Sequence, residues 1–227
     1  MQITEKVSGE TAREYAFRII KNNIVSLELQ PGSSISENEL SKELGVSRTP
    51  IREAIIDLNN ALIVEIYPQR RSYISLIDSD LVEESRFLRE VLDTAVIELA
   101  CDVATEADLT KLEENVKLQE FYLENFVPDK IMELDNDFHK TIFTITKKER
   151  IYAMKNTMML HFDRVRTLSL VSVKDIKIVN DHRLMLEAIK NKDAVSAAAL
   201  VKKHLSRYRI EEEELREKYP TYFKNKK

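Results

Sequence analysis

Glycine is scarce in this sequence. Only three glycines, Gly9, Gly32 and Gly45, occur among 227 residues. Dinucleotide-binding and phosphate-binding loops need clustered glycines, because their backbone must approach the phosphates closely. The sequence therefore excludes Rossmann and phosphate-loop folds. With only five prolines as well, it favours long helices joined by short loops.

Cysteine and long apolar segments are also lacking. The single cysteine, Cys101, excludes an internal disulfide framework. No stretch approaches the roughly 18 consecutive apolar residues that a membrane-spanning helix needs. The polar residues 1–10 show no secretory signal. We therefore expect a cytoplasmic protein with no membrane partner.

An excess of positive charge is missing too. The chain has 35 basic and 39 acidic residues, and residues 1–78 alone carry nine basic and eleven acidic ones. This balance excludes binding to nucleic acid by bulk positive charge alone, so any such binding would need a few focused arginines. A hydrophobic content of 43% is enough to bury one sizeable core, and two smaller ones are expected.

The apolar spacing predicts a mainly α-helical chain that begins with a mixed segment. Helices are expected over residues 11–26, 36–44 and 48–59, and short strands over 63–66 and 73–76. This pattern predicts a winged helix-turn-helix domain over residues 1–76.

A polar junction at 77–80 is expected to link this domain to an all-α antiparallel helical bundle over residues 81–227. The helices expected in this second part cover 80–102, 106–127, 129–146, 148–172, 175–191 and 193–218.

A helix-turn-helix is indicated around Gly45. Ser36 and Glu39 match a capping box that opens the first helix, and Gly45 stands where a helix commonly ends. In the second helix, one face is apolar and is expected to be buried: Ile51, Ala54, Ile55 and Leu58. A recognition helix meets base edges with its N-terminal residues. The DNA contacts are therefore expected from Ser47, Arg48, Thr49 and Arg52.

The loop between the two short strands carries Arg70 and Arg71 and would add a wing on the DNA backbone or minor groove. A plain helical hairpin with exposed arginines is the alternative, and the following strand–loop–strand argues against it. One recognition helix reads only a few bases, so we expect a homodimer on double-stranded operator DNA with two-fold symmetry.

The run from Ser36 to Ala54, with V-S-R-T-P-I-R-E-A at residues 46–54, resembles the winged-helix domain of GntR-family bacterial transcription regulators. The L-Q-P-G segment at residues 29–32 fits the same resemblance. It implies a DNA-binding regulator.

Three of the four histidines are expected to face the core of the helical part. Asp135 and His139 are one helical turn apart beside Phe138 and Ile142. His182 shares a face with Val179, Leu186 and Ile189, and His204 shares one with Ala197 and Val201. A buried carboxylate needs a partner, and one divalent ion would satisfy all four groups. Zinc is the first expectation, with nickel or manganese as alternatives.

Hydrogen-bonded core histidines are the alternative to this metal site. His161 has no comparable partner pattern and is expected to be structural.

Several segments of the helical part resemble the metal-binding branch of the FadR-type C-terminal domain, FCD, of the same family. They are R-E-V-L-D at 89–93, L-D-N-D-F-H at 134–139, D-H-R at 181–183 and the segment 198–205. The resemblance implies Asp135, His139, His182 and His204 as metal ligands around a small-carboxylate pocket. It also implies that Arg89 reaches the carboxylate of the effector. A structural salt bridge is the alternative role for Arg89.

These observations predict a ligand-responsive transcription regulator, a repressor that a small carboxylate metabolite releases from its operator. A metalloenzyme for a small organic acid, tethered to DNA by its N-terminal domain, is the second hypothesis. The sequence lacks S-x-x-K, G-x-S-x-G and H-E-x-x-H patterns, so we expect no enzyme activity.

Overall fold

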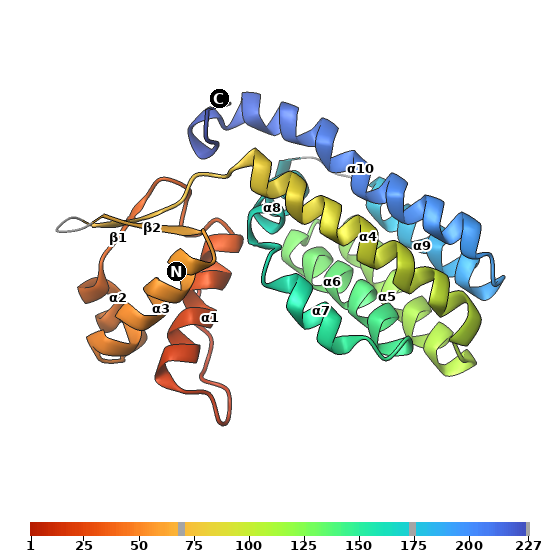
Figure 1. Cartoon of the computed structure of the whole chain (residues 1–227), viewed down its shortest axis with the longest axis horizontal. Helices are drawn as coiled ribbons and strands as arrows, with labels where there is room; N and C mark the ends of the chain where they lie inside the picture. The colour runs from red at the N-terminus through yellow and green to blue at the C-terminus, as the bar shows by residue number, and fades with distance from the viewer. Residues whose placement is uncertain (68–70, 173–175, 226–227) are drawn as a thin grey trace. The chain divides into compact units, whose positions relative to one another are not determined.

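The computed structural model describes residues 1–67, 71–172 and 176–225, and most of them are helical (Figure 1). The elements are α1 (Ala12–Val25), β1 (Ser34–Ile35), α2 (Glu37–Leu44), α3 (Arg48–Asn60), β2 (Val64–Ile66), β3 (Ser72–Ile74), α4 (Ser79–Val103), α5 (Glu106–Glu124), α6 (Pro128–Ile145), α7 (Glu149–Asn156), α8 (Leu160–Ser172), α9 (Ile176–Lys190), α10 (Ala194–Lys218) and the 3₁₀ turn η1 (Pro220–Tyr222). The expected mainly α architecture, with a winged helix-turn-helix followed by an all-helical domain, is confirmed.

Two compact units divide the chain. The first contains Met1–Val82 together with Arg216–Lys227, and the second contains Glu83–Leu215. The sequence assigns all of 81–227 to the helical domain, so the last residues of the chain differ from that expectation. They pack in the first unit because Phe223 is buried there and its neighbours Tyr222 and Lys224 form backbone hydrogen bonds with Ile77.

The first unit is built around α3. Both α1 and α2 pack against this helix, and α3 also packs against β2 of a three-stranded antiparallel sheet of order β1-β3-β2 (Figure 1). The predicted apolar face of α3 is fully buried. Strand β1 was not expected from the sequence, because two residues are too short to show an alternating pattern.

Helix starts in this unit follow their side-chain signals. The Thr11 side chain and the Glu14 side chain form a capping box at the start of α1. The Ser36 side chain accepts a hydrogen bond from the backbone N–H of Glu39 at the start of α2. Gly45 ends α2 in the left-handed conformation, with φ of 65°.

After five other helices, in both units, a residue other than glycine adopts the left-handed conformation. Five non-glycine residues have positive φ, and each lies two residues beyond the end of a helix: Leu27, Leu62, Phe126, Lys147 and Lys192. Side chains with a Cβ pay roughly 1–2 kcal/mol for this conformation. The scarcity of glycine therefore does not remove the tight helix ends; other residues take its place there.

Every secondary-structure element in the described part of the second unit is a helix. Helix α5 packs against α6 and α9, and α6 also packs against α7 and α8 (Figure 1). Large buried side chains, among them Phe138, Phe143 and Phe162, form the core between these helices. No described helix has both the length and the apolar character to cross a membrane.

One long helix expected over residues 148–172 is instead two. Helix α7 ends at Asn156, and α8 begins at Leu160 after a short turn at Thr157–Met159. The turn lets α8 start in a new direction, with Met159 and Leu160 buried. Lys155, near the end of α7, is buried as well although its side chain is charged. No glycine or proline marks the break.

Candidate metal centre and DNA-binding surface

The start of α3 carries the residues expected to contact DNA. Ser47, Arg48, Thr49 and Arg52 are all exposed, opposite the buried face of the helix. Ser47 occupies the N-cap position, but its side chain makes no capping hydrogen bond. The two arginine side chains are 61% and 63% exposed, so both guanidinium groups are accessible to a DNA groove.

Glu37, the first residue of α2, forms ion pairs with both arginines. Arg52 donates from Nε and Nη2 to the two carboxylate oxygens of Glu37, both at 3.1 Å. Arg48 Nη2 lies 3.6 Å from the same carboxylate. These contacts, with that of Arg52 the largest, lower the pKa of Glu37. Both guanidinium groups are therefore held side by side at the start of the recognition helix.

The wing is described only in part. Arg71 is exposed, and its Nη1 donates to the Ser34 hydroxyl at 3.4 Å. Arg70 lies outside the described residues.

The four expected metal ligands meet in the second unit. Asp135 and His139 come from α6, His182 from α9 and His204 from α10. All four side chains are buried, and one candidate ligand atom from each lies within 4.8 Å of the others. Nε2 of His182 is 3.5 Å from Oδ1 of Asp135, and Nε2 of His204 is 4.0 Å from the same oxygen. Three helices thus converge on one carboxylate, as the sequence predicted.

Each histidine has an acceptor near its other ring nitrogen. Nδ1 of His139 lies 3.3 Å from Oδ2 of Asp93 on α4, and Nδ1 of His182 lies 2.7 Å from Oε1 of Gln119 on α5. Nδ1 of His204 lies 3.7 Å from Oδ2 of Asp181 on α9. A metal-ligating histidine usually donates its second N–H to a carboxylate or carbonyl oxygen in this way.

The donor set fits a divalent ion. The Nε2 atoms of His139 and His182 are buried and have no hydrogen-bond partner, which is costly unless another group uses their lone pairs. Ligand atoms about 2.1 Å from a tetrahedral zinc lie roughly 3.4 Å apart. The distances from Asp135 to His182 and His204 are close to that value, so small side-chain shifts would bring these donors into range.

Burial sets the protonation of the cluster. It lowers the pKa of His139 to about 4 and the pKa of His182 well below its usual value. Burial alone would raise the pKa of Asp135, but the neighbouring charge of Arg166, with a smaller contribution from Arg89, outweighs it and holds that pKa well below its usual value. Neutral imidazoles beside an ionised carboxylate are the forms that bind a metal.

Buried cations surround this cluster. Arg89 donates from Nε to Oδ2 of Asp93 at 3.0 Å, and its Nη2 lies 3.6 Å from Oδ2 of Asp135. Arg166 also donates to Oδ2 of Asp135, and Lys155 donates to Oδ1 of Asp93 at 2.8 Å. Arg89 is therefore both part of a salt bridge, which was the alternative role, and adjacent to a candidate metal ligand.

Sequence reasoning missed Asp93, Gln119, Lys155, Asp181 and Arg166. Asp93 and Asp181 stand within the motifs that carry the family resemblance, and each is four residues or fewer from a predicted site residue. That proximity was the only signal for them. Gln119, Lys155 and Arg166 lie on helices that carry no predicted ligand, and their approach is visible only in three dimensions.

His161 lies outside the cluster. It is buried, and its Nδ1 is 2.7 Å from Nη2 of Arg164 on the same helix. This contact agrees with the structural role expected for it.

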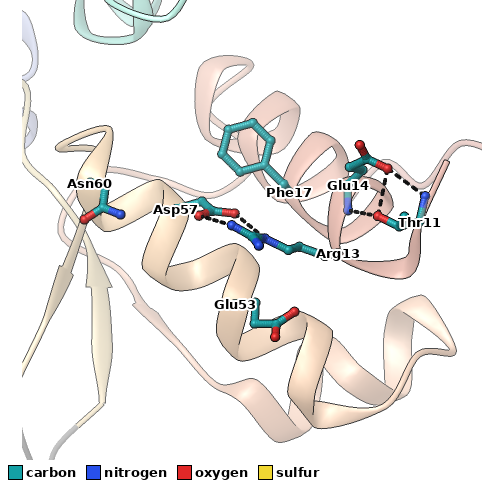
Figure 2. A pocket seen from close by; sticks show the side chains of 7 residues that line it. All are labelled: Thr11, Arg13, Glu14, Phe17, Glu53, Asp57 and Asn60. Carbon is teal, nitrogen blue, oxygen red and sulfur yellow. Dashed lines mark hydrogen bonds and ion pairs between the residues drawn. The ribbon is translucent and has the colours of Figure 1, made fainter.

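An open hollow of about 770 Å³ lies between α1 and α3 (Figure 2). Arg13 points across it and pairs with Asp57 through two hydrogen bonds of 2.7 Å. Phe17, Glu14 and Glu53 also line it. It contains none of the predicted site residues, and its acidic groups are unsuited to binding DNA.

Two family models match the chain. Residues 12–74 match the model for bacterial regulatory proteins of the gntR family, and residues 84–207 match the model for the FCD domain.

Relatives extend over nearly the full length. The HTH-type transcriptional repressor RspR of Escherichia coli K12 is 27% identical over 215 residues, which cover 94% of each chain. An HTH-type transcriptional regulator in an unstable DNA locus of Streptomyces ambofaciens is 28% identical over 222 residues, covering 96% of this chain and 92% of its own. The solved structure of Escherichia coli McbR/YncC has a TM-score of 0.78 at 18% identity, over 92% of this chain and 99% of that one, which shows the same fold.

Proposed function

Because the chain belongs to the GntR family of bacterial regulatory proteins and carries an FCD domain, we propose that a small carboxylate releases this transcription regulator from its operator. The observation that carries the proposal is the buried cluster of one aspartate and three histidines beside Arg89, within the domain that follows the winged helix. The metabolite would act as an inducer, and the protein would act as a repressor.

DNA recognition rests on the first turns of α3. Arg48 and Arg52 would pair with guanine O6 and N7 in the major groove, Ser47 and Thr49 would support them, and the wing with Arg70 and Arg71 would contact the backbone or minor groove. The first 78 residues carry more acidic than basic groups, so two copies binding together must supply much of the affinity.

A homodimer would provide these two copies. Apolar, exposed side chains repeat every four residues along α4: Phe87, Val91, Ala95, Leu99 and Val103. Such a continuous stripe is unusual on a monomer surface and fits the same stripe on a second copy. Two-fold pairing through this stripe would match the two-fold symmetry expected of the operator.

The metal would be held by Asp135, His139, His182 and His204. Zinc suits one carboxylate and three imidazoles, and nickel or manganese are the alternatives. When bound, the ion would supply a Lewis-acidic centre for a carboxylate oxygen. Arg89 would pair with the other oxygen of the effector's carboxylate through its Nη atoms, because its Nε already donates to Asp93.

Regulation requires that the carboxylate favour one arrangement of the helices over another. Arg89 lies on α4, and the same continuous helix begins at Ser79, directly after the wing strand and its short junction. A shift at Arg89 would therefore reach the DNA-binding unit along one helix. We expect the protein to act in the bacterial cytoplasm, where its operator is located.

The metalloenzyme hypothesis is not favoured, because the family and the relatives are transcription regulators. Turnover of a small organic acid by the purified protein would support it instead.

The experiment that tests the metal site combines elemental analysis with thermal unfolding of protein purified without chelator. We expect about one divalent ion per subunit, and a chelator should lower the stability by about 2.7 kcal/mol at a metal concentration 100-fold above Kd. His204→Ala should abolish this shift. His161→Ala, a change at a buried histidine outside the cluster, should lower stability but keep the shift. Metal-free protein with no response to added Zn²⁺ would refute the proposal.

The carboxylate is tested on DNA. Small carboxylates that raise the melting temperature of the metal-loaded protein should also weaken its binding to an operator selected from random DNA. A carboxylate that binds and leaves the operator complex unchanged would contradict the role of inducer.

A further inference from the structure

Asp93 is the most highly connected buried carboxylate beside the cluster. It lies on α4, its side chain is 2% exposed, and it is not one of the four candidate ligands. Three groups from three helices converge on it: Lys155 Nζ at 2.8 Å on Oδ1, and Arg89 Nε at 3.0 Å and His139 Nδ1 at 3.3 Å on Oδ2.

The contact with His139 has a consequence for the imidazole ring. A carboxylate can only accept, so a neutral His139 facing it must carry its proton on Nδ1. Nε2 is then left with a lone pair. This agrees with the surroundings of Nε2, which is buried without a hydrogen-bond partner and would be an unsatisfied donor if it carried the proton.

The tautomer decides whether His139 can bind a metal. Only a nitrogen without a proton can be a ligand. Because Nδ1 of His139 faces Asp93, Nε2 is the ring nitrogen left for a metal. The opposite tautomer would place a hydrogen in the centre of the cluster.

We infer that Asp93 is a positioning residue for the metal site: its carboxylate fixes the Nδ1–H tautomer of His139 and so keeps Nε2 available as a ligand. The effect on metal binding rests on the proposed metal site, whereas the tautomer of His139 is set in the metal-free protein as well. Asp93 is not one of the four candidate ligands, so it would act through His139.

Asp93→Asn is the informative change, because asparagine has nearly the same shape but also offers an N–H₂ donor. The amide can donate to Nδ1 of His139, which moves the ring proton to Nε2. The same replacement at the carboxylate of a Ser-His-Asp triad produces the wrong histidine tautomer.

Lys155→Met provides the matched control. Lys155 is also buried, it contacts the same carboxylate from the other side, and its Nζ lies 4.7 Å from the Phe143 ring, where a methionine can pack. This variant breaks the same buried ion network but leaves Asp93 in place against His139. It therefore separates loss of the tautomer from general disturbance of the core.

Two measurements test the inference on the full-length protein. The first is ¹⁵N NMR of histidine-labelled, metal-free protein, which reads the tautomer of each ring. The second is the affinity for Zn²⁺ alone, by competition with a chelating dye. We expect wild type and Lys155→Met to show Nδ1–H at His139 and Zn²⁺ affinities within about threefold of each other. Asp93→Asn should show Nε2–H and bind Zn²⁺ about 10–100-fold more weakly.

The outcomes are distinguishable. Wild type that does not bind Zn²⁺ refutes the proposed metal site, while the tautomer measurement still tests Asp93. Asp93→Asn that binds Zn²⁺ like wild type, or equal losses in both variants, overturns the inference. If Asp93→Asn fails to fold, the wild-type spectrum alone decides, because an Nε2–H tautomer at His139 would rule out the role given to Asp93.

Discussion

Ile77 pairs in parallel with Phe223, a residue 146 positions further along the chain. The Ile77 N–H donates to the Tyr222 carbonyl at 2.8 Å, and the Lys224 N–H donates to the Ile77 carbonyl at 2.9 Å. Phe223 is 2% exposed, and the Arg216 guanidinium lies 4.9 Å from the centre of its ring. These contacts hold the segment around Phe223 against the junction that follows β3.

Phe223→Ala is expected to destabilise the first unit by about 3 kcal/mol, because it removes a buried aromatic ring and leaves a cavity. Urea unfolding of the full-length protein measures this change. Lys224→Ala is the control. It removes only the exposed ion pair to Asp78 at 3.0 Å and should cost less than about 1 kcal/mol. Equal effects of the two changes would show that the tail contributes no buried packing.

Replacing Arg52 by alanine is expected to weaken operator binding by about 1–3 kcal/mol and to relax base preference at one position of each half-site. The physical reason is the loss of a two-pronged contact to guanine. Fluorescence anisotropy with the selected operator and with single-base variants measures both effects. Arg13→Ala serves as the control, since Arg13 is similarly exposed on α1 but pairs with Asp57 beside the hollow of Figure 2. Unchanged specific binding by the Arg52 variant would remove this residue from the interface.

The sequence predicted the four cluster residues because helical spacing alone shows which side of a helix is apolar. Asp135 and His139 share such a side with Phe138, and both are buried as expected. Spacing says nothing about which residues of other helices face that side. Gln119 therefore could not be assigned to His182, nor Lys155 to Asp93, before the helices were packed together.

The same limit explains the differences in the fold. The periodicity of residues 148–172 continues across the turn at Thr157–Met159, so the pattern predicted one helix instead of α7 and α8. The docking of Phe223 depends on contacts across most of the chain length, which no local pattern encodes.

Metal-free protein is expected to lose stability as the pH falls from about 6.5 to about 4. Burial lowers the pKa of His139 to about 4 in the folded protein, while the usual value of 6.5 holds in the unfolded chain. In this window the unfolded chain binds more protons, so the free energy of unfolding decreases with falling pH by up to about 1.4 kcal/mol per pH unit. His182, whose pKa is also lowered, adds to the slope.

Urea unfolding between pH 4 and pH 7.5, in the presence of a chelator, measures this dependence. Near pH 7.5 both histidines are almost entirely neutral in both states and should contribute little slope. His139→Gln is expected to flatten the curve between pH 6.5 and pH 4. A variant with the same slope as the wild type would show that His139 is not protonated on unfolding in that range.

Introducing a charge into the α4 stripe is expected to separate the proposed dimer. Val91 is 51% exposed within the stripe, and Val91→Glu would bring like charges together in a two-fold interface formed by the stripe. Sedimentation at micromolar concentration should show monomer for this variant and dimer for wild type. Val195→Glu, at a valine that is 82% exposed on α10, should remain dimeric. A dimer in both variants would place the interface elsewhere.

Arg89→Ala is expected to keep DNA binding and metal binding but to lose the response to the carboxylate inducer. Its guanidinium approaches the cluster from α4, 3.6 Å from Asp135, yet it is not a ligand and lies outside the winged helix. Coupling between an effector and DNA is typically about 1–3 kcal/mol, so its loss should leave operator affinity within about twofold with and without the carboxylate. Arg86→Ala is the matched control, because Arg86 is also buried on α4 but pairs with Glu83 and Glu90. The opposite outcome is that the carboxylate releases the Arg89→Ala variant from the operator at the same carboxylate concentration as it releases wild type. In that case another cation must bind the carboxylate, and Arg89 serves only to hold Asp93.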